Sequence, residues 1–221
     1  MTFNPKIHRR RSIRLQGYDY SQAGAYFITI CTQNRECMFG EIVDGKMVLN
    51  HAGKMIQTVW DEIPIHYAGI ETDEFVVMPN HIHGIIIIVV GATPCGCPVS
   101  TPRGCPDNGQ PRGVAPTEPA GNTETLSLGD MVHRFKTMTT KRYADGVKQN
   151  GWAPFPGRLW QRNYWEHIVR NEMELNRIRE YIHTNPTQWK FDRLNLAERK
   201  IGGPTMVREP VFDYTTEGWM V

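Results

Sequence analysis

The feature that most constrains the fold is an apolar, β-branched run that carries two histidines, DEFVVMPNHIHGIIIIVV over 73–90. Runs of valine and isoleucine are typical of strands. Because successive side chains of a strand point to opposite faces, we expect His81 and His83 on one face, with Ile82 and Ile85 packing on the other. The run therefore predicts a sheet with two imidazoles on one pleated face, which is half of a metal site.

The rest of the chain alternates between strand and helix patterns. A β-branched run predicts a strand over 25–32, Asp44-Gly45 predicts a hairpin turn, and a further strand is predicted over 75–78. Apolar residues at helical spacing predict helices over about 50–63, from 127 onward, and over about 172–184. This order predicts an α+β fold, in which an antiparallel sheet of five elements carries helices packed on one face.

Composition indicates one domain with a long insertion. The chain has 221 residues and a formal net charge of +2, so contacts to nucleic acid would have to come from local clusters of basic residues. One cluster, Arg9, Arg10 and Arg11, lies in a basic N-terminal arm over 1–24, and another, with Arg134 and Lys141, lies in a predicted helix. The domain itself is predicted over 25–193, and no role is predicted for the tail over 194–221.

Residues 91–125 are rich in proline and glycine and contain almost no aliphatic side chains, which predicts a flexible surface insert. Its three cysteines do not form the two Cys-x₂-Cys pairs of a four-ligand zinc site. The chain has five cysteines and no recognisable secretory signal, which predicts free thiols and a cytoplasmic location. The longest apolar run, 84–91, is too short to cross a bilayer, so we expect a soluble protein without a membrane partner.

The helix predicted over 172–184 carries polar side chains next to the apolar face that is expected to pack into the core. Asn171 is a candidate N-cap, and Pro186 ends the helix at or before residue 185. At 100° per residue, Tyr181 lies on a flank of this apolar face, with Arg177 one turn before it and Asn185 one turn after it. A phenol and an amide could therefore face the histidine strand together, and imidazole with oxygen ligands suits Mn²⁺, Zn²⁺ or Mg²⁺.

Three separated motifs carry a resemblance to a known family. They are VVMPNHIHGIII, the paired segments LWQRNYWEHIVRN and YIHTNP, and the opening RRSIRLQGYDYSQAGAYFITICTQNR. Together they resemble the single-tyrosine transposases associated with bacterial repetitive extragenic palindromes (REPs), over about residues 10–189 without the insert. The resemblance implies a ferredoxin-like HUH fold, named for the His-hydrophobic-His strand of these single-strand DNA transesterases.

The resemblance also implies a site and a chemistry. It implies His81 and His83 as metal ligands, Asn185 as an amide ligand and Tyr181 as the nucleophile, with Mg²⁺ or Mn²⁺ as the divalent ion. The partner would be single-stranded or hairpin DNA, cleaved and rejoined through a 5′-phosphotyrosine by a monomer or a homodimer. The basic residues expected to contact DNA are Arg9, Arg10, Arg11, Arg134, Lys141, Arg162 and Arg177.

Several alternatives stay open at the level of sequence. Tyr164 is a rival nucleophile because it lies near Arg162 and His167, although Ile168 stands where an amide ligand would be needed. A domesticated relative could grip hairpins without cutting them. A metal-dependent phosphodiesterase could use water as its nucleophile, in which case Tyr181 would be structural.

Overall fold

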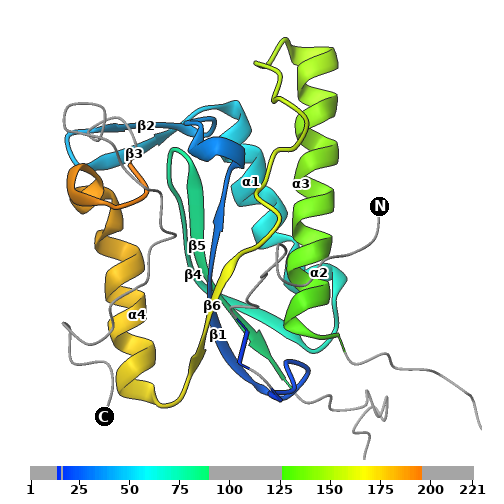
Figure 1. Ribbon diagram of the computed structural model, residues 1–221, viewed down its shortest axis with the longest axis vertical. Helices are drawn as coiled ribbons and strands as arrows, with labels where there is room; N and C mark the ends of the chain where they lie inside the picture. Colours follow the sequence, from blue (N-terminus) through cyan, green and yellow to red (C-terminus); the bar gives the residue numbers. More distant parts are fainter. Residues whose placement is uncertain (1–13, 16, 90–125, 196–221) are drawn as a thin grey trace, which may run out of the picture.

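The computed structural model describes residues 14–15, 17–89 and 126–195 (Figure 1). The predicted arm residues Arg9, Arg10 and Arg11, the insert over 91–125 and the tail beyond 195 lie outside these residues. The strands are β1 (Gly24–Cys31), β2 (Gly40–Val43), β3 (Lys46–Leu49), β4 (Ile70–Val77), β5 (His81–Ile88) and β6 (Trp165–Val169). The α-helices are α1 (His51–Asp61), α2 (Ile63–His66), α3 (Leu128–Asn150) and α4 (Glu172–Thr184), and short 3₁₀ segments are η1 (Gln33–Arg35) and η2 (Asn185–Phe191).

The central sheet has four antiparallel strands in the order β4-β5-β1-β6. Along the chain its strands alternate with two helices as β1-α1-β4-β5-α3-β6, and β1 lies in the sheet between β5 and β6. This β-α-β-β-α-β order is the ferredoxin-like arrangement. The predicted fold class, an α+β ferredoxin-like fold with helices packed on an antiparallel sheet, is confirmed.

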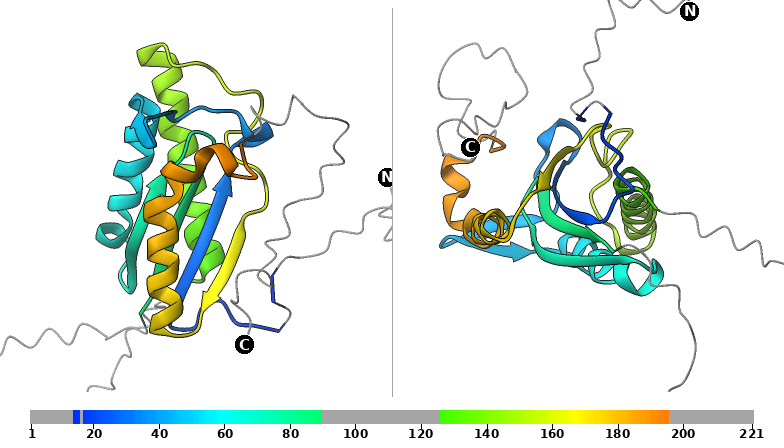
Figure 2. Two further views of the ribbon diagram at one scale, coloured as in Figure 1. Left: turned by 90° about the vertical axis from the view of Figure 1, so that its left-hand side faces the viewer. Right: turned by 90° about the horizontal axis from the view of Figure 1, so that it is seen from below.

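Three details of the prediction were wrong. The hairpin β2–β3 forms a separate two-stranded sheet, so the main sheet has four strands rather than five. Strand β6 was not predicted, because its five residues are all half-buried at a sheet edge and lack the alternation of a half-exposed strand. The helices cover both faces of the sheet rather than one, with α4 on the opposite side from α1 and α3 (Figure 2).

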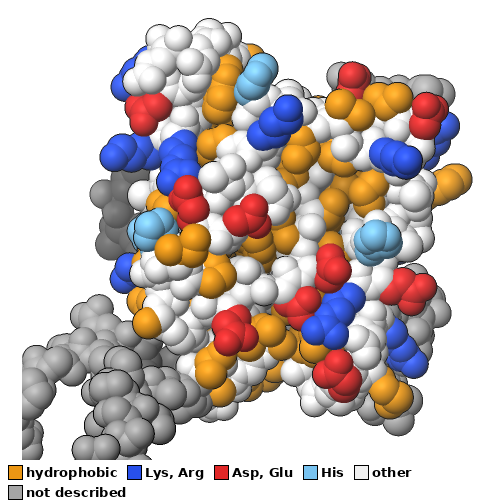
Figure 3. Space-filling view, turned by 180° about the vertical axis from the view of Figure 1, so that it is seen from behind, with side chains coloured by type: hydrophobic (Ala, Val, Ile, Leu, Met, Phe, Trp, Pro, Cys, Tyr) orange, Lys and Arg blue, Asp and Glu red, His pale blue; other side chains and the backbone are white. Residues whose placement is uncertain are grey.

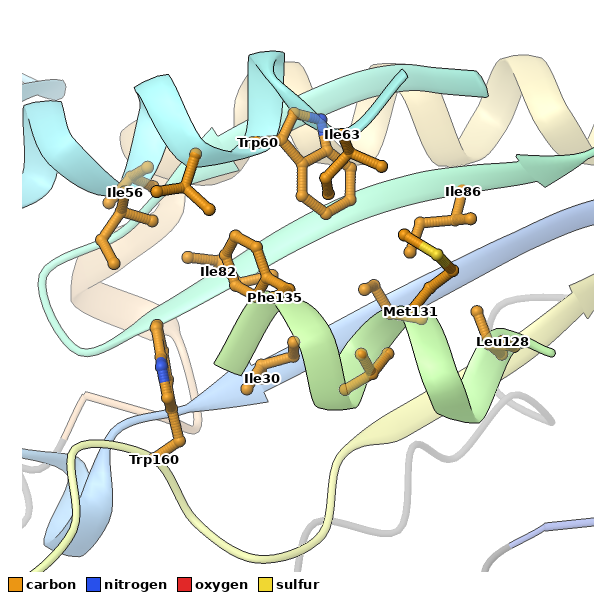
Figure 4. Packing of buried hydrophobic residues seen from close by; sticks show 14 of the residues in the cluster. Ile30, Ile56, Trp60, Ile63, Ile82, Ile86, Leu128, Met131, Phe135 and Trp160 are labelled. Atoms are coloured by element: carbon orange, nitrogen blue, oxygen red, sulfur yellow. The ribbon is translucent and has the colours of Figure 1, made fainter. Parts of the chain in front are cut away.

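Alternate side chains of β5 point into two different layers of the molecule, one on each face of the sheet. Ile82 and Ile86 pack with Ile30 of β1 and with the apolar faces of α1 and α3, in the large cluster shown in Figure 4. Ile85 packs instead with Ile178 and Ile182 of α4, on the face that carries the histidines. The expectation that Ile85 would lie opposite the histidines was therefore wrong, because residues 81, 83 and 85 share one parity.

Gly84 lets helix α1 approach the sheet closely behind the histidines. The rings of Trp60 and Phe75 stack with centroids 4.2 Å apart, and a Cβ atom on Gly84 would lie 2.5 Å from Trp60. A side chain at this position would clash with the stack, which explains a glycine inside an otherwise β-branched strand.

The predicted helix starts are present. Ser127 and Asp130 form a capping box at the start of α3, and the Asn171 side chain accepts a hydrogen bond from the Glu174 backbone at the start of α4. The predicted bounds of 172–184 match α4. No helix within the described ranges has the length and apolarity needed to span a membrane.

Candidate active site

The site is built around His81 and His83, the odd-numbered side chains at the start of β5. Both imidazoles are fully buried, on the face of the sheet that α4 covers. Their Nε2 atoms lie 3.0 Å apart, and their rings meet edge to face. The predicted shared face is thus confirmed, and the two nitrogens converge on one point.

Asn80 fixes the tautomer of His81. Its Nδ2 atom donates to the backbone carbonyls of Arg35 and Leu194, at 3.1 and 2.8 Å, so its Oδ1 atom must be the acceptor. That oxygen lies 2.8 Å from Nδ1 of His81, which therefore carries the proton. The Nε2 atom of neutral His81 consequently presents a lone pair, as a metal ligand must.

His83 is held from the neighbouring strand. Its Nδ1 atom lies 2.8 Å from the hydroxyl of Thr29, the residue that pairs with it across β1 and β5. Burial lowers the pKa of His83 to about 3, and burial, then His83 and Arg35, lower the pKa of His81. Both imidazoles are therefore neutral at neutral pH and able to bind a cation.

Tyr181 reaches this face from α4, and Asn185 caps the end of that helix one turn later. The Tyr181 ring lies 5.3 Å from the His83 ring and 6.0 Å from the Phe27 ring, measured between centroids. Asn185 is buried, and its side-chain oxygen has no hydrogen-bond partner among the described residues. An unsatisfied buried amide oxygen is costly, and a bound cation would satisfy it.

A carboxylate that the sequence analysis missed also reaches the histidines. Asp192 follows η2, and its Oδ2 atom lies 3.6 Å from Nε2 of His81. One ligand atom from each of His81, His83 and Asp192 lies within 4.8 Å of the others. No spacing rule connects Asp192 to a strand so far away in the chain; the only available signal was a carboxylate shortly after the YIHTNP motif.

The rival nucleophile Tyr164 lies in the other layer. It packs against the α1 and α3 cluster, and its hydroxyl accepts a hydrogen bond of 2.6 Å from Arg14. Burial and Glu166 raise the pKa of its phenol, while Arg14 opposes the shift. The structure thus brings Tyr181, and not Tyr164, to the histidine ring.

The predicted DNA-contacting residues that the structure describes are spread over both layers. Arg177 is exposed on α4, one turn before Tyr181, and Arg162 is exposed ahead of β6. Arg134 and Lys141 belong to α3, across the sheet from the histidines, and the Arg134 guanidinium lies 5.0 Å above the Tyr67 ring. On the face shown in Figure 3, Lys and Arg side chains are interspersed with Asp and Glu rather than gathered in one patch.

Comparison with known proteins finds two relatives that differ in their sequence identity to this chain. No protein-family model matches the chain. An uncharacterized protein of Haemophilus influenzae is 38% identical over 196 residues, which cover 87% of this chain and 96% of the relative. A second protein of the same organism, named "Putative REP-associated tyrosine transposase", is 21% identical over 173 residues, covering 77% of this chain and 74% of that protein.

Two solved structures are similar in part. A REP-associated tyrosine transposase bound to a REP hairpin aligns with a TM-score of 0.47 at 18% identity, covering 81% of this chain and 76% of that one. A protein of Deinococcus radiodurans described as a "putative transposase" aligns with a TM-score of 0.38 at 18% identity, covering 77% and 95%. The resemblance to REP-associated tyrosine transposases is confirmed by the sequence similarity to the second Haemophilus influenzae protein. By its 38% identity, the chain belongs to the same family as the first Haemophilus influenzae protein.

Proposed function

We propose that the protein is a transposase-like enzyme that cleaves and rejoins single-stranded DNA at palindromic hairpins, with Tyr181 as its nucleophile. The observation that carries the proposal is the contact between the Tyr181 ring and His83, one of two buried, neutral histidines on a strand distant in sequence. The motif resemblance and the second Haemophilus influenzae relative support the same chemistry.

The proposed cofactor is Mg²⁺ or Mn²⁺. His81, His83 and Asn185 would hold it, because two lone-pair nitrogens and an unsatisfied amide oxygen suit a divalent cation. When bound, the ion would polarise a non-bridging oxygen of the scissile phosphate.

Tyr181 would supply the covalent step. Its oxygen forms a bond to phosphorus, the bond from phosphorus to the 3′ oxygen breaks, the phenol loses its proton, and the released 3′ oxygen gains one. The product is a 5′-phosphotyrosine and a free 3′-hydroxyl. Because a phenol has a pKa near ~10, well below that of an aliphatic alcohol, a second 3′-hydroxyl can reverse the step without ATP.

The remaining assignments follow from this proposal. Residues 25–193 would form the catalytic domain, interrupted by the insert over 91–125, and the arm over 1–24 would contact DNA through Arg9, Arg10 and Arg11. Arg134, Lys141, Arg162 and Arg177 would provide further phosphate contacts. The enzyme would act in the cytoplasm as a monomer or a homodimer.

The decisive experiment is to search for a covalent protein–DNA adduct. The purified protein is incubated with single-stranded hairpins from the neighbourhood of its own gene, with Mg²⁺ or Mn²⁺, and separated under denaturing conditions. We expect an adduct with the wild type, none with Tyr181→Phe, and an undiminished adduct with the matched control Tyr164→Phe.

Each contrary result points to a defined alternative. An adduct formed by Tyr181→Phe would place the nucleophile elsewhere. Hairpin binding without a wild-type adduct would indicate a binding protein, and cleavage without one would indicate a phosphodiesterase that uses water.

A further inference from the structure

We propose that Asp192 is a fourth protein ligand of the divalent ion, beside His81, His83 and Asn185, and that Asn80 positions the Asp192 carboxylate. The inference rests on the metal-dependent function proposed above and extends its ligand set beyond the tyrosine helix. Its basis is the position of the carboxylate beside the two imidazoles, at the end of the segment that begins with Asn185.

The first step is the geometry of the donor atoms. The Oδ2 atom of Asp192 lies 3.6 Å from Nε2 of His81, and both imidazole Nε2 atoms lie 3.0 Å from each other. The Asp192 side chain is 11% exposed and the His81 side chain is fully buried. A cation between these three donor atoms could be bound by the carboxylate and by both neutral imidazoles at once.

The second step is how the carboxylate is held. The other oxygen of Asp192, Oδ1, accepts a hydrogen bond of 2.7 Å from the backbone nitrogen of Leu194. The Leu194 carbonyl accepts from Nδ2 of Asn80, whose Oδ1 atom accepts from His81. One buried amide therefore orients His81 and also holds the turn that carries Asp192, as outer-shell partners of metal sites do.

The third step is charge. Two neutral imidazoles and an amide leave a divalent ion uncompensated, and imidazoles alone favour Zn²⁺ over Mg²⁺. A carboxylate adds one negative charge and an oxygen donor of the kind that Mg²⁺ and Mn²⁺ prefer. Asp192 would therefore bias the site toward the ions that the proposed reaction needs.

The test measures metal binding in the absence of DNA. Metal-free full-length protein is titrated with Mn²⁺, and free Mn²⁺ is followed by electron paramagnetic resonance. Asp192→Asn keeps an oxygen that can accept from Leu194 but removes the charge. We expect its affinity to fall by at least the factor of about 10 to 100 that loss of an outer-shell partner typically causes. The matched control Asp61→Asn, which changes an exposed aspartate on α1, should bind as the wild type does.

Folding is monitored separately for each variant. Thermal melting with and without Mn²⁺ gives the metal-induced stabilisation, which depends on affinity by mass action. Asp192→Asn should keep the metal-free melting temperature and lose most of the Mn²⁺-induced increase. If it instead melts early without metal, Asp192→Glu, which restores the charge, should recover the Mn²⁺-induced increase.

A double-variant cycle tests the role of Asn80. Asn80→Ala should weaken Mn²⁺ binding. The combined Asn80→Ala/Asp192→Asn variant should lose less binding free energy for Mn²⁺ than the sum of the two single losses, because both changes act partly through the Asp192 carboxylate. Strictly additive losses of Mn²⁺ binding free energy would show that Asn80 does not position Asp192.

Wild-type Mn²⁺ affinity in a folded Asp192→Asn variant would overturn the inference. That result is distinguishable from failure of the proposed function, because a protein that forms no DNA adduct can still bind Mn²⁺ through Asp192.

Discussion

At the scale of single residues, burial of two imidazoles makes stability depend on pH. The pKa of His83 is lowered to about 3 by burial, whereas an unfolded histidine titrates near ~6.5. Below that pH the unfolded chain binds a proton that the folded site excludes, so the free energy of unfolding falls as the pH falls from ~6.5 toward about 3. Between pH ~7 and ~5 we expect His83 alone to cost about 2 kcal/mol, measured by urea denaturation with a chelator present.

The control is a variant that cannot titrate at this position. His81→Gln/His83→Gln should lose clearly less unfolding free energy than the wild type over the same pH range. Equal losses in the two proteins would show that other groups cause the acid sensitivity.

At the scale of elements, the sheet separates the two helices that carry predicted phosphate contacts. Arg177 lies on α4 beside Tyr181, whereas Lys141 lies on α3 in the other layer. For a short single strand bound at Tyr181, we expect Arg177→Gln to reduce the slope of log affinity against log salt by about 1. Lys141→Gln should leave that slope unchanged and reduce it only for longer hairpins that reach the α3 side. Fluorescence anisotropy at several salt concentrations measures both, and an effect of Lys141→Gln on the short strand would contradict this assignment.

At the scale of the whole molecule, the two hydrophobic clusters are built from segments on either side of the insert over 91–125. Deleting residues 92–122 and bridging the ends with a short Gly/Ser linker should therefore leave a folded, active protein. Loop closure changes by only about 0.6 kcal/mol per doubling of loop length. A melting temperature close to that of the wild type and an undiminished DNA adduct are the expected results. Precipitation of the shortened protein, or loss of a bound zinc ion, would show that the insert is structural.

The sequence alone determined what depends on local geometry. Strand parity places His81 and His83 on one face, and the same parity, correctly applied, places Ile85 with them. The cap at Asn171 and Pro186 set the bounds of α4, and helical spacing set Tyr181 one turn before Asn185. These relations hold over a few residues, where backbone geometry leaves few choices.

Tertiary structure decided what depends on contacts between distant segments. It placed Tyr181 and Tyr164 in different layers, paired the weakly patterned β6 with β1, and brought Asp192 to His81 through the turn that Asn80 holds. Local patterns record which side chains share a face, but not which segment packs onto that face. Which segment packs onto a face depends on the burial of side chains from the whole chain, because only the assembled core determines which loop lies next to the two histidines.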